Sequence, residues 1–242
     1  MKHHVLYDDG HHKCVAFSMP EDEESVPSNQ FLIIDGNEAA VIDPGGDLTF
    51  SPLTMNIIKH TRLDNIRYVI GSHQDPDIIA SMPRWLIHVE GAKILIPKLW
   101  ERFLPHYNSA FTKGRLKQSL SERLMTMPDS GGYYPLGNSG IVAMTAHFLH
   151  SVGNFQFYDP ISKILFSGDM GASLVGDSGE NVKDFRTHIS KMEGFHRRYM
   201  TSKKVTRLWA QSVRDLDVSM MVPQHGYRLE GTEVFHQFLD WI

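Results

Sequence analysis

The feature that most constrains this chain is a short run of metal-ligand side chains directly after a predicted strand. Residues 67–72 are predicted to form the strand, and His73, Asp75 and Asp77 follow it at alternate positions. In extended backbone such positions share one face. Pro76 helps to end the strand, and Asp77 falls where a helix begins, where a carboxylate suits the helix dipole. For this segment alone, a polar turn with an N-cap aspartate is an equal alternative.

Three further predicted strands end in the same way. They span residues 141–149, 163–167 and 220–223. The residues at their ends are His150, Asp169 and His225, each close to a glycine or a proline. In open α/β sheets, functional sites gather at the carboxyl ends of strands. Four strand ends that each carry His or Asp therefore predict a single metal centre, whereas one such end alone would not be sufficient evidence.

The order of the predicted elements indicates the fold class. Residues 30–46 hold two apolar runs around the hairpin signal Gly36-Asn37. Helices are predicted at 52–62, 77–89, 98–107, 184–217 with a break near Thr201, and 232–242. Further strands are predicted at 93–96 and 154–158. Residues 19–29 are expected to form a surface loop, and residues 108–132 give no clear pattern. The chain begins with strands, continues with alternating helices and strands, and ends with strands followed by helices. This order favours an α/β fold. We expect one domain over 1–242, an αββα sandwich of two mixed β-sheets with helices outside.

Composition excludes several classes of function. Lys and Arg number 24 against 28 Asp and Glu, and a net charge of −4 does not suit a nucleic-acid binder. No segment approaches the roughly 20 apolar residues that span a bilayer, and the N-terminus lacks the apolar run of a signal peptide, so we expect a cytoplasmic protein with no membrane partner. The one cysteine, Cys14, excludes an intrachain disulfide and a multi-cysteine metal site, which leaves His, Asp and Glu as the expected ligands.

The set of motifs resembles the metallo-β-lactamase superfamily. The matching positions, in chain order, are the segment Ile42-Asp43-Pro44-Gly45, the motif His73-x-Asp75-x-Asp77, His150, Asp169 and His225. Hydrolases of the superfamily usually have His where this chain has Asp75, whereas the flavo-di-iron oxygen and nitric-oxide reductases have an acid there. Two departures from those reductases are Ile78, which replaces a histidine, and the end of the chain at Ile242, without their flavodoxin-like domain. The resemblance is therefore greatest to stand-alone oxygen-binding di-iron proteins linked to bacterial chemotaxis.

This resemblance implies a set of roles for the ligands. His73, Asp75 and His150 would hold a first metal, Asp77 and His225 a second, and Asp169 would bridge the two. Carboxylates and imidazoles suit iron, so we expect two iron ions, bridged by an oxo, hydroxo or peroxo species when oxidised. Ile78 would leave the second metal with an open position beside an apolar wall, although it is equally interpreted as a core residue of the first helical turn.

The expected function is an oxygen sensor that binds dioxygen, with a chemotaxis signalling protein as a partner and a homodimer as the assembly. Two enzymatic alternatives remain open: a binuclear metallohydrolase, and an oxygen or nitric-oxide reductase served by a separate flavoprotein.

Other residues have plainer interpretations at this stage. We expect His147 to pack, and Cys14 to be a small core residue without a redox role. Tyr227 is expected to be buried, with contact to a bound oxygen ligand as the less favoured alternative. His88, His188 and His196 are expected on the surface or behind the metal ligands, and His3, His4, His11 and His12 on terminal strands, where a metal clip is a less favoured alternative. The basic stretch at 183–207 is expected to be a solvated face rather than a docking surface.

Overall fold

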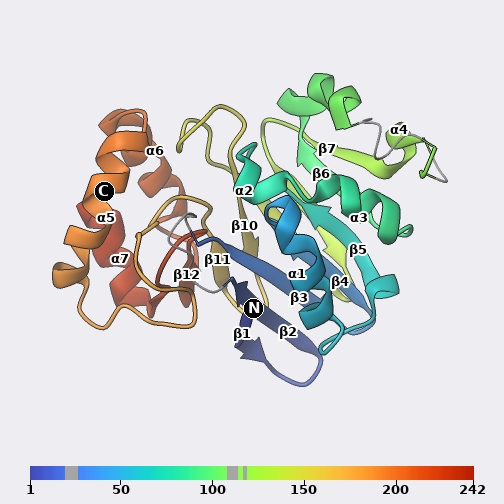
Figure 1. Ribbon diagram of the computed structural model, residues 1–242. Coiled ribbons are helices and arrows are strands. Elements are labelled where there is room, and N and C mark those ends of the chain that lie inside the picture. Colours follow the sequence, from blue (N-terminus) through green and yellow to red (C-terminus); the bar gives the residue numbers. More distant parts are fainter. Residues whose placement is uncertain (20–26, 108–113, 117–118) are drawn as a thin grey trace.

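Two β-sheets face one another at the centre of the molecule, and helices cover their outer faces (Figure 1). The computed structural model describes residues 1–19, 27–107, 114–116 and 119–242. The first sheet runs in the order β1 (Lys2–Asp8), β2 (His12–Ser18), β3 (Asn29–Asp35), β4 (Glu38–Ile42), β5 (Ile66–Ile70), β6 (Lys93–Pro97) and β7 (Leu124–Met127). It is antiparallel as far as β4 and parallel from β4 to β7.

The second sheet is antiparallel except for one pair of strands. Its order is β13 (Leu229–Glu230), β12 (Met220–Val222), β11 (Ile164–Phe166), β10 (Phe155–Asp159), β9 (Ser139–Thr145) and β8 (Gly132–Leu136). Strands β11 and β12 are parallel. Both sheets are therefore mixed, and the predicted αββα sandwich is confirmed.

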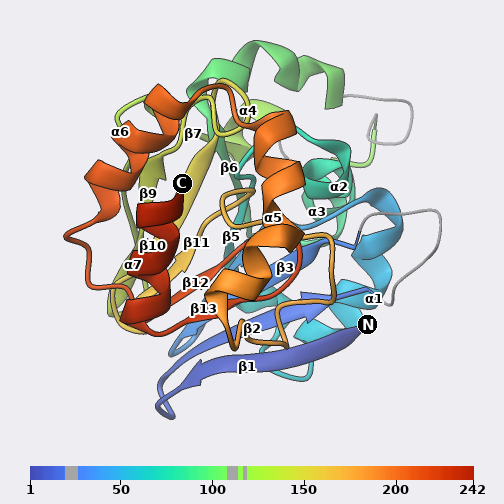
Figure 2. The ribbon, with the colours of Figure 1, turned by 90° about the vertical axis from the view of Figure 1, so that its left-hand side faces the viewer.

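Helices pack on the outer face of each sheet (Figures 1 and 2). Those against the first sheet are α1 (Phe50–Ile57), α2 (Pro76–Ile79) and α3 (Met82–His88), and those against the second are α5 (Phe185–Tyr199), α6 (Lys203–Val213) and α7 (Thr232–Trp241). Shorter elements are α4 (Leu120–Arg123) and the 3₁₀ helices η1 (Asp47–Thr49), η2 (Leu63–Asn65) and η3 (Lys98–Tyr107). None of the helices in the described ranges is long and apolar enough to cross a membrane.

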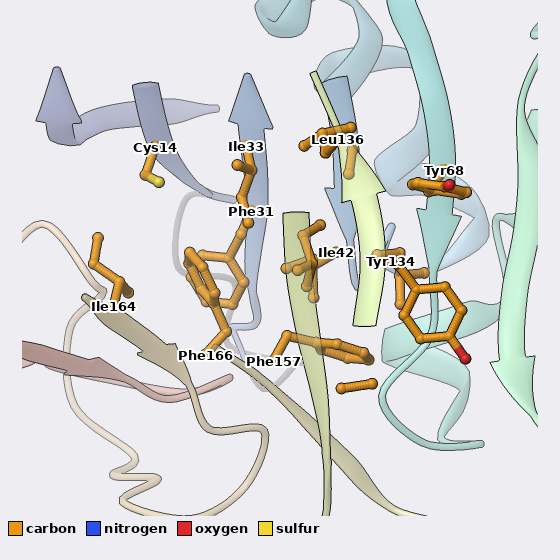
Figure 3. Packing of buried hydrophobic residues seen from close by; sticks show 14 of the residues in the cluster. Cys14, Phe31, Ile33, Ile42, Tyr68, Tyr134, Leu136, Phe157, Ile164 and Phe166 are labelled. Carbon is orange, nitrogen blue, oxygen red and sulfur yellow. The ribbon is translucent and has the colours of Figure 1, made fainter. Parts of the chain in front are cut away.

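Three hydrophobic clusters hold these four layers together. The central cluster lies between the sheets and includes Phe31, Ile42 and Phe157, all at most 1% exposed (Figure 3). A second cluster lies between the first sheet and its helices, around Trp85, and a third lies under α5–α7, around Phe238. Complete burial of such side chains stabilises the fold by about 1.5–3 kcal/mol each.

The predicted helix at 77–89 is wrong as a single element, because the structure divides it into α2 and α3. Pro83 lacks an N–H and its ring would clash with the carbonyl four residues earlier, so it is tolerated only near a helix start. The break leaves Ser81 outside both helices, where its N–H donates to Gly45 O (3.0 Å) and its hydroxyl donates to Pro44 O (2.9 Å). The interruption therefore fastens the connection after β5 to the loop after β4.

The end of α3 is held by a buried arginine. The Arg123 guanidinium donates to the carbonyls of Leu86 (3.2 Å), Val89 (2.7 Å) and Ala92 (2.7 Å). Carbonyls at a helix C-terminus have no partner within the helix. The Arg123 side chain, from the residue directly before β7, supplies these carbonyls with hydrogen-bond donors.

Other predicted boundaries need smaller corrections. The strand at 141–149 ends at Thr145, because Phe148 adopts a φ of 68° that extended backbone excludes, and residues up to 154 form a loop. Residues 98–107 form the 3₁₀ helix η3, and the break near Thr201 is confirmed between α5 and α6. Most of the expected loop at 19–29 lies outside the described residues, as does part of 108–132.

Candidate metal centre

The six predicted ligands come together at one end of the sandwich. His73, Asp75 and Asp77 lie in the connection from β5 to α2 of the first sheet. The other three come from the second sheet, in the segments that follow β9, β11 and β12: His150, Asp169 and His225. Both halves of the molecule therefore contribute side chains to the same place, as the strand-end pattern predicts.

One group of three ligands is tightly clustered. Donor atoms of His73, Asp75 and His150 all lie within 4.8 Å of one another. Asp75 Oδ2 is 3.2 Å from His150 Nε2 and 3.8 Å from His73 Nε2. Two imidazole nitrogens and one carboxylate oxygen at these separations can coordinate the same cation.

Asp169 joins this group to a second one. Its Oδ2 lies 3.0 Å from His150 Nε2 and 3.4 Å from His73 Nε2, whereas its Oδ1 lies 3.6 Å from His225 Nε2. His225 Nε2 is in turn 3.6 Å from Asp77 Oδ2. The two oxygens of one carboxylate therefore face two different sets of ligands, which is the arrangement of a bridging carboxylate.

The Asp169 carboxylate also fits a cation on electrostatic grounds. The residue is 2% exposed, and its Oδ1 has no hydrogen-bond partner among the described residues. A buried carboxylate oxygen without a partner is costly. Three carboxylates and three imidazoles form an oxygen-rich donor set that suits a pair of divalent metals such as iron or manganese.

The imidazole of His73 is oriented by a chain of two buried residues. Ser72 Oγ lies 2.9 Å from His73 Nδ1 and donates to Asp43 Oδ2 (2.9 Å), and the Ser72 N–H donates to Asp43 Oδ1 (2.7 Å). His73 Nδ1–H therefore donates to the Ser72 hydroxyl, which leaves Nε2 free to face the centre. Burial raises the pKa of Asp43 to about 7, against the hydrogen bonds from Ser72.

The His225 ring is held from behind in a similar way. His225 Nδ1 donates to Pro27 O (2.8 Å), which again directs Nε2 to the centre. His150 lies in the loop after β9, where the Thr201 hydroxyl donates to Phe148 O (2.7 Å). A carbonyl on Nδ1, as Pro27 O is for His225, fixes the tautomer and orientation of a metal-binding histidine.

The charges of the ligands are strongly coupled in the absence of cations. Hydrogen bonds to Asp169 and Asp75 raise the pKa of His150 to about 10. Burial lowers the pKa of His73, so this ring is neutral and ready to coordinate. Burial alone would raise the pKa of Asp169, but the hydrogen bond from His150 holds it below its usual value. A proton on His150 therefore supplies one of the positive charges that a bound cation would otherwise provide.

Residues of α2 and α5 lie next to the predicted ligands. Ile78 is completely buried in α2, directly after Asp77. From α5, the Phe195 ring lies 6.3 Å from that of His225, and the Tyr199 ring lies 5.8 Å from that of His150. The two aromatic rings contact each other at 4.7 Å, so one helix covers a histidine of each ligand group.

Histidines outside the ligand set have varied environments. His196 is buried, accepts a hydrogen bond from Gly171 N (3.0 Å) and so supports the turn after Asp169. His188 is buried and stacks on Tyr227, which the structure places against that ring. His147 lies in the loop after β9, with Nε2 3.1 Å from Asp129 O.

Residues that sequence reasoning gave no role are Ser72, Thr201, Phe195 and Tyr199. Asp43 was identified only as part of a motif, and its contact with Ser72 follows from the pairing of β4 with β5, which local patterns do not specify.

Comparison with known proteins gives the family. The family model described as "ODP family beta lactamase" matches residues 26–226. This chain belongs to the ODP family. It is similar to a solved structure of the chemotaxis sensor ODP described as a peroxy diiron species, with 35% identity, a TM-score of 0.85, and coverage of 100% of this chain and 94% of that one. It is also similar to the apo state of ODP from T. denticola, with 37% identity, a TM-score of 0.84, and coverage of 99% and 93%.

A more distant likeness shows the fold alone. The rubredoxin oxygen:oxidoreductase of Desulfovibrio gigas shares 15% identity with a TM-score of 0.74, over 88% of this chain and 52% of that one. A search of curated proteins found no match. The predicted membership of the metallo-β-lactamase superfamily is confirmed by the family model, and the fold is shared with flavo-di-iron proteins.

Proposed function

We propose that this chain is a non-haem di-iron protein that binds dioxygen and acts as an oxygen sensor in bacterial signalling. The observation that carries the proposal is the Asp169 carboxylate, whose two oxygens face separate His/Asp groups at 3.0–3.6 Å. The ODP relative, solved with a peroxy diiron species and described as a chemotaxis sensor, supports both the metal and the role.

In this proposal His73, Asp75 and His150 hold one iron, Asp77 and His225 hold the other, and Asp169 bridges them. A reduced pair of iron ions held by these residues would supply two electrons to dioxygen. The protein contributes the rest: Ser72 and Pro27 orient His73 and His225, and the buried Asp169 offsets positive charge. Ile78 is completely buried beside Asp77, so no seventh side chain from this turn is available as a polar ligand.

The experiment is metal analysis combined with optical spectroscopy. Protein from iron-replete cells should contain two irons per chain, and the reduced form should gain a visible absorption band on exposure to air. His188→Asn is a matched control, because His188 is buried against Tyr227 and is not a proposed ligand; it should keep both irons. Stoichiometric zinc, with no air-dependent band and with hydrolysis of an ester or lactam, would instead establish the metallohydrolase alternative.

A second measurement separates a sensor from a reductase. Oxygen and nitric-oxide consumption should be slow with an electron donor that contains no flavin, because the proposed role is to retain bound dioxygen. Fast steady turnover with such a donor would overturn the sensor assignment. The chemotaxis partner, the homodimer and a cytoplasmic location remain predictions, and co-purification with a chemotaxis signalling protein would test the first of them.

A further inference from the structure

A second cluster of ligand-type side chains lies between the sheets, away from the centre described above. His12 and Cys14 lie on β2, and Asp159 ends β10. Their donor atoms all lie within 4.8 Å of one another. His12 is 3% exposed and the other two are 0% exposed. His12 lies on a terminal strand, as expected, and it is buried there.

This cluster lies at the opposite end of the sandwich from the six predicted ligands. Phe155 N, at the start of β10, donates to Ser72 O (2.9 Å), next to His73. Asp159 is at the other end of the same strand, which at ~3.4 Å per residue places it about 13 Å away. In Figure 3 the Cys14 side chain lies beside Ile33 at one border of the central cluster.

The geometry of the three donor atoms fits a small tetrahedral cation. Asp159 Oδ2 lies 2.8 Å from His12 Nε2 and 3.3 Å from Cys14 Sγ, and the nitrogen and sulfur are 3.8 Å apart. Around a tetrahedral zinc-type ion such atoms are separated by about 3.3–3.6 Å. Shifts of about half an ångström would therefore bring all three into coordination. Ser162 Oγ, 3.5 Å from Cys14 Sγ, is the nearest oxygen for a fourth position.

A carboxylate lies beside the Nδ1 atom of His12, on the side of the ring that faces away from the proposed metal. His12 Nδ1 is buried without a hydrogen bond among the described residues, and Asp35 Oδ2 lies 3.7 Å from it. A carboxylate behind a histidine fixes the tautomer that leaves Nε2 for a metal. Asp35 is itself 2% exposed, so both an unpaired donor and a carboxylate are buried where this arrangement needs them.

We propose that His12, Cys14 and Asp159 bind one zinc-type divalent transition-metal ion, with Asp35 as the carboxylate that orients His12. A thiolate, an imidazole and a carboxylate are the ligand types that such ions prefer. One thiolate and one carboxylate neutralise the two charges of the ion, which suits a buried position. This site departs from the expected ligand types of His, Asp and Glu by including one cysteine.

The single cysteine makes the test specific. Co²⁺ is the probe, because a thiolate bound to Co²⁺ absorbs in the near ultraviolet, and none of the six residues of the main centre is a cysteine. The full chain with its main centre loaded should develop this band and saturate at one additional Co²⁺ per chain. Zn²⁺ should then remove the band by displacement. Absence of the band at saturating Co²⁺ would overturn the proposal.

Variants separate a metal site from a network of hydrogen bonds. Cys14→Ser should abolish the band and weaken Zn²⁺ binding at this site at least tenfold, and His12→Gln should do the same. Asp35→Asn should keep the band but weaken binding 10–100-fold. Asp169→Asn should lose iron and keep the band, which separates this site from the main centre. A third ion that binds Cys14→Ser with unchanged affinity, or a band that survives His12→Gln, would refute the assignment.

Discussion

Replacement of Ser72 by alanine tests how far the orientation of His73 depends on residues behind it. Ser72→Ala removes the hydroxyl that accepts from His73 Nδ1 and donates to Asp43 Oδ2. Asp43 keeps the bond from the Ser72 N–H, so the carboxylate stays in place and only the link to the ring is lost. The change therefore acts on one ligand without removing it.

The expected losses of stability and of metal affinity in Ser72→Ala follow from two independent magnitudes. Loss of a buried hydrogen bond to a charged or ligating group costs about 1–3 kcal/mol of unfolding free energy. Loss of a partner behind a metal-binding histidine weakens metal binding about 10–100-fold, which corresponds to about 1.4–2.7 kcal/mol. We therefore expect Ser72→Ala to weaken the metal at the His73 group by this factor, and the metal held by Asp77 and His225 much less.

The matched control is Ser81→Ala. Ser81 is as buried as Ser72 and lies in the same connection, but its hydroxyl donates to Pro44 O and contacts none of the six predicted ligands. The assay is a chelator competition titration of both variants beside a thermal melt. Ser81→Ala should lose comparable stability and keep its metal affinity within about twofold. Equal losses of affinity in the two variants would refute the reasoning, because the effect would then follow general destabilisation.

Four other perturbations test separate parts of the structure. Asp169→Asn should empty both metal positions and His150→Gln only one, so metal analysis should give a lower content in the first; equal contents would argue against bridging. Ile78→His should shorten the lifetime of the air-dependent band if the second metal has an open position, and Ile78→Val controls for packing; an unchanged decay with a lowered melting temperature would mean that the residue is structural. Because the pKa of His150 is about 10 in the metal-free protein, metal binding near pH 7 should release a proton from it and tighten about tenfold per pH unit; calorimetry in buffers of different ionisation enthalpy counts the protons, and none released would contradict the charge on this ring. Arg123→Met should cost about 3 kcal/mol or more by freeing three buried carbonyls, seen as a fall in melting temperature of roughly 6–12 °C with unchanged metal content.

The sequence predicted which polar side chains come together better than it predicted the backbone that carries them. His or Asp beside Gly or Pro at strand ends is a local signal, and the structure brings all six such residues together. Residues 77–89 looked like one helix because their apolar spacing is helical, but Pro83 interrupts the hydrogen-bond ladder. The proline was a visible signal, and it decides the boundary more strongly than periodicity does.

The supporting contacts could not be predicted in this way. The bond between Ser72 and Asp43 joins residues 29 positions apart, and it exists because β4 and β5 are parallel neighbours. The burial of His12 likewise depends on Asp159, 147 positions away. Local patterns determine which residues stand at a strand end, whereas the order of strands within a sheet determines which ends meet.

Because the six predicted ligands arise equally from the two sheets, metals bound there would have a mechanical role as well as a chemical one. On the proposed ligand set, the first metal would link β5 to β9 and β11, and the second would link β5 to β11 and β12. Such a link removes conformational freedom from the unfolded chain and restrains the sheets from sliding past each other. The outer helices of each half rest on these sheets, so a change of a few tenths of an ångström at the centre has a path to the surface.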